Sequence, residues 1–246
     1  MTLSYNKSKK WGIILAAGFG TRLRPITDKI PKPLVEIGGK TLLDHAINNM
    51  VKAGVNNIVV NGHYKWQQIK DHLENTFKQD DIKIHFVLEP EILETGGGIM
   101  NIMERFDIDS ALVSNSDTLL ISKKNHPLHS LTAFDKDAEL IMMIQHKSKS
   151  IQGISKGDLR VVDNNKFVFD PITRGDYIFL GSYFLKRSIF SDRREVSKFS
   201  MTDYISKSTN STYKDLEYYV VEYDEIFLDI GTIDLLNKAI DIISNT

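Results

Sequence analysis

Short apolar runs alternate with longer amphipathic stretches along the first half of the chain. Four runs are apolar at most positions and predict buried strands: 13–16, 57–61, 82–88 and 111–117. Apolar residues recur at helical spacing in three stretches between these runs: 42–51, 66–77 and 99–105. Thr41 is a typical N-cap for the first of these helices, and Gly54 can end it. Strands separated by helices indicate right-handed βαβ units and a mostly parallel sheet, which is an α/β fold.

The second half is less regular and predicts shorter elements. Further strands are expected at seven places: 34–37, 140–145, 159–162, 166–169, 177–185, 218–221 and 226–228. Helices are expected at three: 125–135, 200–207 and 233–243. The strands on either side of 163–165 should form a hairpin, and the last two strands should pair across a turn at 223–225. We expect 147–150 to be a solvated loop and Thr232 to cap the last helix.

Length and composition are those of an ordinary folded domain. The 246 residues are 41% hydrophobic and 26% charged, so we expect one domain over 11–246 behind a flexible tail at 1–10. A net charge of −1 provides no basic field for nucleic acid. The absence of cysteine excludes disulfides, thiolate catalysis and zinc-thiolate sites. Because no apolar run suits a signal peptide or a membrane span, a cytoplasmic location without membrane partners is expected.

The stretch 13–34, IILAAGFGTRLRPITDKIPKPL, combines the features of a polyphosphate site. Gly18 and Gly20 allow a tight turn whose backbone N–H groups can form an anion nest. Arg22 offers a planar fork of donors to phosphate oxygens. Two prolines stiffen the chain on both sides of Lys32, so its ammonium is held at a defined place. The Walker and dinucleotide-binding patterns are both incomplete here, which excludes the two commonest glycine-loop families.

The complete string resembles the signature of the sugar-1-phosphate nucleotidyltransferases, which join a nucleoside triphosphate to a sugar 1-phosphate. This resemblance extends from Gly12 to about Ala239. It implies a Rossmann-like, mixed but mostly parallel sheet flanked by helices, the nucleotide-diphospho-sugar transferase fold. It also implies a set of nucleotide-binding residues: Ala16, Ala17, Gly18, Gly20, Thr21, Arg22, Lys32, Glu94, Thr95 and Gly96.

A second loop, 89–98, follows the strand at 82–88 and therefore lies at the same edge of the sheet. Its three successive glycines allow close approach of the backbone to a flat base. The string LETGGGI at 93–99 is most similar to that of bacterial N-acetylmuramate-1-phosphate uridylyltransferases. This similarity implies UTP and N-acetylmuramate 1-phosphate as substrates, in peptidoglycan recycling.

The base remains open on chemical grounds. A carboxylate at Glu94 can accept both N1–H and N2–H of guanine, whereas uracil offers one N–H. If backbone groups read the base instead, uracil fits equally well. A mannose-1-phosphate guanylyltransferase, which shares the other motifs, is therefore the alternative.

Two aspartates are expected at strand ends that face the same crevice. Asp117 ends Asn-Ser-Asp, where the family pattern has Asn-Gly-Asp or Asn-Ala-Asp, so one small residue differs. Asp229 opens Asp-Ile-Gly-Thr, which resembles the late Asp-x-Gly-Thr motif of the family. The resemblance implies that both aspartates bind Mg²⁺, an ion that is commonly held by one or two carboxylates plus phosphates.

The sugar side of the site lies where the resemblance is weakest. Many family members place Glu-Lys-Pro after the hairpin, but 169–171 is Phe-Asp-Pro, so the lysine is missing. Arg174 or Lys166 are candidates to replace it. Asn115 and Gly181 are expected to contact the sugar, since a glycine in a strand lets a ligand approach the backbone. The oligomeric state is not predictable from the sequence.

The implied reaction is in-line attack of the sugar phosphate on the α-phosphate of the triphosphate, with pyrophosphate leaving. We assign Arg22 to the β- and γ-phosphates and Lys32 to the α-phosphate, where charge builds up. The attacking oxygen is already ionised at pH 7, so no general base is needed and the histidines require no catalytic role. A catalytically inactive nucleotide-sensing subunit is a further alternative. The presence of four catalytic candidates, Arg22, Lys32, Asp117 and Asp229, argues against it.

Overall fold

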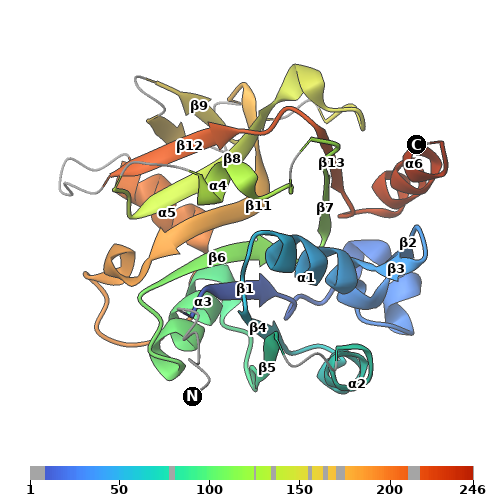
Figure 1. The fold of residues 1–246 in the computed structure, drawn as a ribbon, viewed down its shortest axis with the longest axis horizontal. Coiled ribbons are helices and arrows are strands. Elements are labelled where there is room, and N and C mark those ends of the chain that lie inside the picture. The colour runs from blue at the N-terminus through green and yellow to red at the C-terminus, as the bar shows by residue number, and fades with distance from the viewer. Residues whose placement is uncertain are drawn as a thin grey trace, which may run out of the picture.

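The computed structural model describes eight segments of the chain: 9–77, 81–124, 126–133, 137–154, 157–162, 166–169, 175–209 and 217–245. Four parallel strands form the centre of the fold, in the spatial order β6 (Ser110–Asn115), β1 (Trp11–Leu15), β4 (Asn57–Gly62) and β5 (Lys83–Leu88). They alternate along the chain with three helices (Figure 1): α1 (Leu42–Lys52), α2 (Trp66–Thr76) and α3 (Glu94–Arg105). The predicted βαβ order is confirmed, and most of the expected tail at 1–10 lies outside the described residues.

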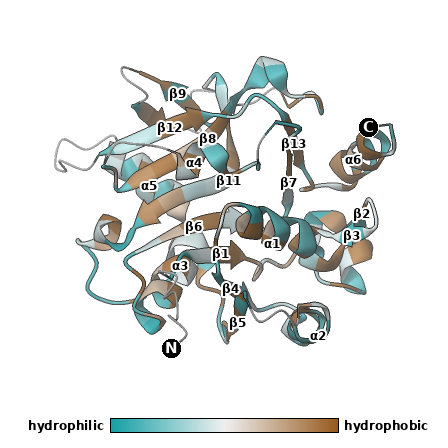
Figure 2. Ribbon diagram, viewed as in Figure 1, coloured by the Kyte–Doolittle hydropathy of each residue, from teal (hydrophilic) through white to brown (hydrophobic). Residues whose placement is uncertain are grey.

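Helices cover both faces of the sheet. Successive side chains of β1 point to opposite faces, so neighbouring residues pack against different helices. Ile13 packs in one apolar cluster with Ile99 of α3. Ile14 packs in another with Ile47 of α1 and Ile69 of α2. All five side chains are fully buried. In Figure 2 the helices around the sheet show both brown and teal, as expected for helices with one apolar side.

An antiparallel extension widens the sheet beyond β6. β11 (Tyr177–Lys186) pairs antiparallel with β6 and with β8 (Leu140–His146). β12 (Tyr218–Glu222) pairs parallel with β8. β9 (Leu159–Val161) and β10 (Phe167–Phe169) form the predicted hairpin and join β11. The sheet is mixed, as expected, and it has nine strands.

A separate two-stranded sheet corrects one prediction. β13 (Ile226–Asp229) pairs antiparallel with β7 (Thr118–Ile121), a strand that the sequence pattern did not indicate. The expected pairing of 218–221 with 226–228 is therefore wrong. The reason lies in the turn between them, where the buried amide of Gln145 donates to the carbonyls of Tyr223 and Glu225 and holds the chain against β8. The β7–β13 register places Asp229 opposite Thr118, next to Asp117.

The helices of the second half match their predictions less evenly. α5 (Met201–Thr209) and α6 (Ile233–Ser244) lie where expected, and Thr232 caps α6 by accepting from the N–H of Leu235. α4 (His129–Thr132) is much shorter than the predicted helix 125–135, of which residues 125, 134 and 135 lie outside the described segments. α3 begins at Glu94, so the three glycines lie within this helix rather than before it.

Short elements complete the chain. The expected strand at 34–37 is a strand only in its second half, as β2 (Glu36–Ile37), and Leu34 belongs to a 3₁₀ turn. β2 forms a small hairpin with β3 (Lys40–Thr41), and α6 contacts β2 (Figure 1). Part of the expected loop at 147–150 is also a 3₁₀ turn. The 3₁₀ turns are η1 (Thr21–Leu23), η2 (Ile26–Asp28), η3 (Lys32–Leu34), η4 (Lys147–Lys149) and η5 (Arg187–Phe190).

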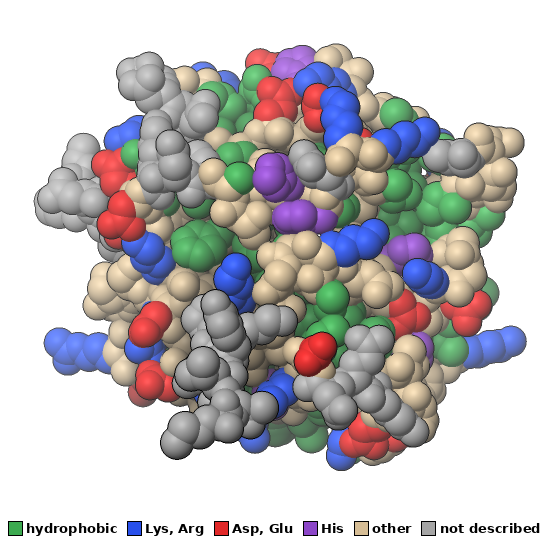
Figure 3. All heavy atoms as spheres, viewed as in Figure 1, with side chains coloured by type: hydrophobic (Ala, Val, Ile, Leu, Met, Phe, Trp, Pro, Cys, Tyr) green, Lys and Arg blue, Asp and Glu red, His purple; other side chains and the backbone are tan. Residues whose placement is uncertain are grey.

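The surface carries charges of both signs. On the face shown in Figure 3, acidic and basic side chains are interspersed rather than gathered in one field. This agrees with the net charge of −1. Within the described part of the chain, no helix combines the length and the apolar character that crossing a membrane requires.

Candidate active site

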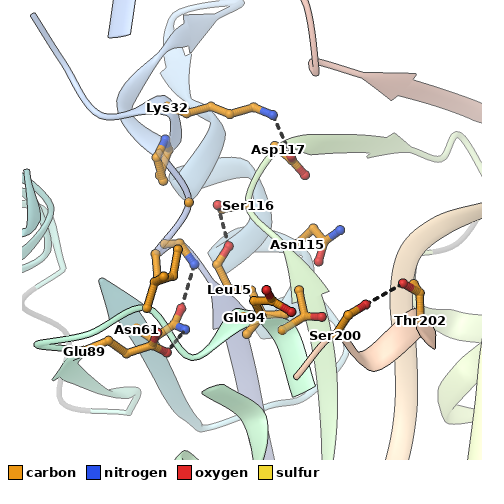
Figure 4. Close-up of a pocket in the computed structure, with 16 residues that line it drawn as sticks. Leu15, Lys32, Asn61, Glu89, Glu94, Asn115, Ser116, Asp117, Ser200 and Thr202 are labelled. Atoms are coloured by element: carbon orange, nitrogen blue, oxygen red, sulfur yellow. Dashed lines mark hydrogen bonds and ion pairs between the residues drawn. The ribbon is translucent and has the colours of Figure 1, made fainter. Parts of the chain in front are cut away.

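A cavity of about 410 Å³ opens at the carboxyl ends of the central strands (Figure 4). Its walls come from six separate parts of the chain: Leu15, Ala16, Ala17, Gly18, Lys32, Pro33, Asn61, Glu89, Ile92, Glu94, Thr95, Asn115, Ser116, Asp117, Ser200 and Thr202. Most of the predicted site residues are in this group. Six predicted residues are not among the lining residues: Gly20, Thr21, Arg22, Gly96, Gly181 and Asp229.

A lysine and an aspartate meet at one end of the cavity. The Nζ of Lys32 lies 2.6 Å from Oδ2 of Asp117 (Figure 4), and only 9% of Lys32 is exposed. The stem of Lys32 packs against Gly20, where an added Cβ would lie 3.0 Å from the Cβ of Lys32. Gly20 also has a φ of +65°, a left-handed backbone conformation that glycine adopts more easily than other residues. The glycine loop therefore packs against the stem of Lys32, and the ammonium of Lys32 borders the cavity.

The turn that carries Asp117 is anchored to β1. The Oγ–H and N–H of Ser116 both donate to the carbonyl of Leu15, at 2.7 and 3.2 Å. The serine that stands where the resembled pattern has glycine or alanine thus adds a hydrogen bond. It fixes the position of Asp117 at the strand ends.

Buried hydrogen bonds connect the ends of β1, β4 and β5. The side-chain amide of Asn61 accepts from the N–H of Ala16 and donates to Oε1 of Glu89, both at 2.7 Å. Oε2 of Glu89 accepts from the N–H of Leu93 at 3.0 Å. Asn61 and Glu89 are 2% and 1% exposed, and their partners satisfy them. Our sequence analysis assigned no role to either, although each directly follows an apolar run, as Asp117 does.

Asp229 lies beside Asp117. The N–H of Ile230 donates to the carbonyl of Asp117 at 3.0 Å, which joins the two aspartate turns. Burial, and then the negative charge of Asp117, raises the pKa of Asp229 above its ordinary value. Lys32 and Arg22 oppose this effect. Two acids in this arrangement favour a bound cation.

Arg22 lies next to this pair rather than in the cavity wall. Its Nη2 is 3.2 Å from the point where a Cβ on Gly231 would lie, and Oδ1 of Asp229 is 2.9 Å from the same point. The absence of a side chain at Gly231 therefore leaves room for both groups. Arg22 is exposed on η1, which Thr21 begins. Its guanidinium is available to a phosphate at the cavity mouth.

The glycines of α3 are used for packing. An added Cβ would lie 2.2 Å from the ring of Phe199 at Gly96 and 2.3 Å from the carbonyl oxygen of Ser197 at Gly97. The N–H groups of both glycines point to the carbonyl of Phe199, at 3.0 and 3.3 Å. Segment 197–199 thus lies close to the backbone of these glycines, where we had expected the base of a nucleotide. Contact of Gly96 with a nucleotide stays a prediction.

Glu94 and Thr95 do face the cavity. Glu94 has φ +59°, an unusual conformation for a residue with a side chain, and its carboxylate is 3.8 Å from the ammonium of Lys198. Oγ1 of Thr95 accepts from the N–H of Met201 at 2.9 Å. These contacts tie the second loop to the start of α5.

Two hydroxyl groups that sequence reasoning missed complete the wall opposite Asn61. Ser200 and Thr202 lie at the start of α5, with 2.9 Å between their hydroxyl oxygens (Figure 4). They flank Met201, whose side chain is buried in the core. No local motif marks them, because the packing of α5 on α3 brings them to the cavity.

The two predicted sugar contacts come from neighbouring strands, Asn115 from the end of β6 and Gly181 from within β11. A Cβ on Gly181 would lie 2.8 Å from Nδ2 of Asn115, so the structure brings these two residues together. The amide of Asn115 fills the space beside the glycine. Lys166 pairs with Glu217 at 3.3 Å and is not a lining residue, whereas Arg174 lies outside the described segments. The replacement for the missing lysine is therefore not found at Lys166.

The two aspartates are suitable ligands for Mg²⁺. They offer carboxylate oxygens from adjacent turns, which is the donor type that this ion prefers. Across the described ranges, no three side chains of the His, Cys, Asp and Glu types are grouped to hold a metal. Phosphate oxygens and water would have to complete the coordination, as is usual for Mg²⁺ at phosphate-transfer sites.

Known proteins are similar in sequence to this chain over most of its length. Residues 11–246 match the sequence model of the nucleotidyl transferase family. A D-glycero-alpha-D-manno-heptose 1-phosphate guanylyltransferase of Campylobacter jejuni is 28% identical, over 89% of this chain and 93% of that protein. A mannose-1-phosphate guanyltransferase of Gibberella zeae is 32% identical over 89% of this chain but only 60% of its own length. An N-acetylmuramate alpha-1-phosphate uridylyltransferase of Caulobacter vibrioides is 29% identical, with coverages of 76% and 79%.

Solved structures share the fold. HddC from Yersinia pseudotuberculosis is 26% identical, with a TM-score of 0.71 over 95% of this chain and 99% of that one. A UDP-glucose pyrophosphorylase complexed with UDP-glucose has a TM-score of 0.78 over 97% of this chain and 100% of its own. At 18% identity, this second likeness concerns the fold alone. The expected nucleotide-diphospho-sugar transferase fold is thereby confirmed.

Proposed function

The chain belongs to the sugar-1-phosphate nucleotidyltransferase family, and on this premise we propose that its cavity binds a nucleoside triphosphate and a sugar 1-phosphate and joins them. The observation that carries the proposal is the Lys32–Asp117 pair at 2.6 Å, with Asp229 beside it. A cation and two carboxylates at one end of the cavity suit the meeting of two phosphates. The nucleotidyl transfer itself is common to this family, and the residue roles and substrates are our proposal.

The reaction forms one bond and breaks one. A sugar-phosphate oxygen attacks the α-phosphorus, and the bond from this phosphorus to the bridging oxygen of the β-phosphate breaks, so that pyrophosphate leaves. Lys32 stabilises the charge that builds up on the α-phosphate. Arg22, at the cavity mouth, binds the outer phosphates through its planar fork. No proton has to be removed, because the attacking oxygen is ionised at neutral pH.

Asp117 and Asp229 hold Mg²⁺ in this proposal. When bound, the ion neutralises phosphate charge and helps to orient the triphosphate. The protein keeps the two carboxylates in place through the bonds from Ser116 to β1 and from Ile230 to Asp117. The raised pKa of Asp229 supports the assignment, because a bound cation would relieve the repulsion between the two acids.

UTP and N-acetylmuramate 1-phosphate are the first substrate pair. Support comes from LETGGGI at 93–99 and from the similarity to the Caulobacter uridylyltransferase. In this case backbone groups around Ala16 and Thr95 would bind the uracil edge, with the hydroxyls of Ser200 and Thr202 nearby.

GTP and a mannose-type sugar 1-phosphate are the second pair. The carboxylate of Glu94 lines the cavity, whereas that of Glu89 is already bonded to Asn61 and Leu93. A carboxylate can accept both N–H groups of the guanine edge, whereas it would face the carbonyl oxygens of uracil. The Campylobacter and Gibberella relatives, both named guanylyl enzymes, also support this pair.

A substrate matrix tests the proposal. Pyrophosphate release would be measured with Mg²⁺ and UTP, GTP, dTTP or CTP. Each triphosphate would be combined with N-acetylmuramate, mannose, manno-heptose, glucose or N-acetylglucosamine 1-phosphate. One dominant combination is expected, and it selects between the two pairs. Binding of triphosphate without release in any combination would favour the sensing subunit instead.

A further inference from the structure

One buried glutamine, Gln152, contacts the backbone of Asp229 on both sides. It lies in the turn after η4, where its neighbour Ile151 is 51% exposed but Gln152 itself only 2%. Oε1 of Gln152 accepts from the N–H of Asp229 at 2.6 Å, and Nε2 donates to the carbonyl of Asp229 at 3.0 Å. A strand neighbour in an antiparallel sheet makes the same pair of bonds to one residue. The side-chain amide of Gln152 therefore takes the place of a neighbouring strand's backbone, on the edge of β13 away from β7.

The same amide also reaches across the Asp-Ile-Gly-Thr turn. Nε2 of Gln152 donates to the carbonyl of Leu235 in the first turn of α6, at 3.0 Å. The ammonium of Lys238 donates to the main-chain carbonyl of Gln152 at 3.1 Å. The end of β13 and the start of α6 are thus both attached to one residue. The segment between them carries Asp229 and the Gly231 gap that accommodates Arg22.

We infer that Gln152 is a positioning residue of the metal site, which holds the Asp229 carboxylate toward Asp117. Two carboxylates side by side repel each other, so the backbone of one has to be held if both are to face the same ion. β7 holds Asp229 from one side, and Gln152 holds it from the other. The inference rests on the proposed function, since it requires Asp229 to be a metal ligand.

The chain supplies a matched control. Gln145 is also buried, with 1% exposure, and its Nε2 also donates to two carbonyls, those of Tyr223 and Glu225. These carbonyls lie at the opposite end of β13, away from Asp229. Loss of either glutamine removes hydrogen bonds of the same kind near the same strand. Of the two glutamines, only Gln152 bonds to Asp229, which lies beside Asp117 in space.

The test compares Gln152→Met with Gln145→Met in the full-length protein. Binding of Mn²⁺ alone, a paramagnetic substitute for Mg²⁺, is followed by EPR, and thermal unfolding is recorded in parallel. We expect both variants to lose similar stability. Gln152→Met should bind Mn²⁺ roughly 10-fold more weakly, the usual effect of removing support from a metal ligand, and Gln145→Met should bind it as the wild type does. The milder Gln152→Asn replaces Gln152→Met if the latter does not fold.

Asp229→Asn distinguishes a failure of the proposed metal site from a failure of the proposed role of Gln152. If Asp229→Asn leaves Mn²⁺ binding unchanged, the proposed metal site is wrong. If Asp229→Asn weakens binding but Gln152→Met and Gln152→Asn do not, the inference about Gln152 is overturned while the metal site stands. Equal weakening in Gln145→Met and Gln152→Met would also overturn it, because the effect would then reflect general loosening of β13.

Discussion

The ammonium of Lys32 and the carboxylate of Asp117 are paired, at 2.6 Å between Nζ and Oδ2. In the proposed reaction these groups have different partners, the α-phosphate for the lysine and Mg²⁺ for the aspartate. Each therefore neutralises the other until substrate arrives. Exchange of these partners requires little movement, because both groups already border the cavity.

Replacement of Lys32 by methionine should lower kcat by roughly 100-fold or more, because the charge on the α-phosphate loses its nearest cation. The fold should persist, since the apolar stem remains packed against Gly20. Lys29→Met is the control, as Lys29 is exposed on the same segment and does not line the cavity. Steady-state pyrophosphate release measures both. Full activity of the Lys32 variant would remove this residue from the mechanism.

Asp229→Asn should make the ion-free protein more stable while it abolishes most activity. Burial and Asp117 raise the pKa of Asp229, and an acid with a raised pKa loses its stabilising contribution as the pH rises through that value. Above this pKa the charge on Asp229 therefore lowers the stability of the ion-free protein, and asparagine removes that charge. We expect a gain in Tm of about 2–4 °C, which is roughly 1 kcal/mol in a chain of this size. A lower Tm for the variant without metal would contradict the charge argument.

The requirement for Mg²⁺ should increase in weakly acidic solution. Protons compete with the ion for Asp229 at a higher pH than for an ordinary aspartate, because the pKa of Asp229 is raised. The half-saturating Mg²⁺ concentration should thus rise as the pH falls, by up to about 10-fold per pH unit once the pH is below this pKa. Mg²⁺ titrations of pyrophosphate release between pH 8 and pH 5.5 measure it. The trend should be absent in Asp229→Asn, and its persistence there would point to another group.

Two glycines should respond to alanine in opposite ways. At Gly96 the new methyl group collides with the ring of Phe199, so Gly96→Ala should destabilise the fold by about 1–3 kcal/mol. At Gly18 a Cβ meets nothing within 4 Å, so Gly18→Ala should keep its stability. If the loop receives phosphates, Gly18→Ala should instead raise KM for the triphosphate, by roughly 10-fold for a loss of about 1.4 kcal/mol. Urea unfolding and steady-state kinetics of both variants would show the crossed pattern or refute it.

The role of Glu94 in base choice can be tested by Glu94→Gln. If its carboxylate binds guanine, the variant should lose roughly 10-fold or more in kcat/KM for GTP, since charge-assisted hydrogen bonds are the stronger ones. If the backbone reads uracil, kcat/KM for UTP should change little. Glu91→Gln is the matched control, because Glu91 lies on the same loop but does not line the cavity. Equal effects of the two substitutions would exclude a specific role for Glu94.

The sequence predicted best those features that depend on neighbouring residues. Local apolar patterns placed β1, β4, β5 and β6, and a local cap signal placed the start of α1, where Thr41 accepts from the N–H of Asp44. Lys32 and Asp117 were both expected at the site. Their direct pairing was not, because it joins residues 85 positions apart.

Features set by tertiary packing were missed or misassigned. The packing role of the α3 glycines was also missed: the ring of Phe199 and the carbonyl of Ser197 lie where side chains at Gly96 and Gly97 would stand. β12 and β13 looked like a hairpin because they are close in sequence, yet each pairs with an earlier strand. Gln152 carried no signal at all, since its turn resembles any solvated loop until Asp229 is placed against it.

The most direct test of the central claim is pyrophosphate release by the wild type and by Asp117→Asn and Asp229→Asn, measured across a Mg²⁺ titration with the best substrate pair. Our account predicts release that requires Mg²⁺ and stops on chelation. Both variants should be slower by roughly 100-fold or more at the Mg²⁺ concentration that saturates the wild type. Release that proceeds at the wild-type rate in either variant, or without a divalent ion, would contradict the assignment of the two aspartates.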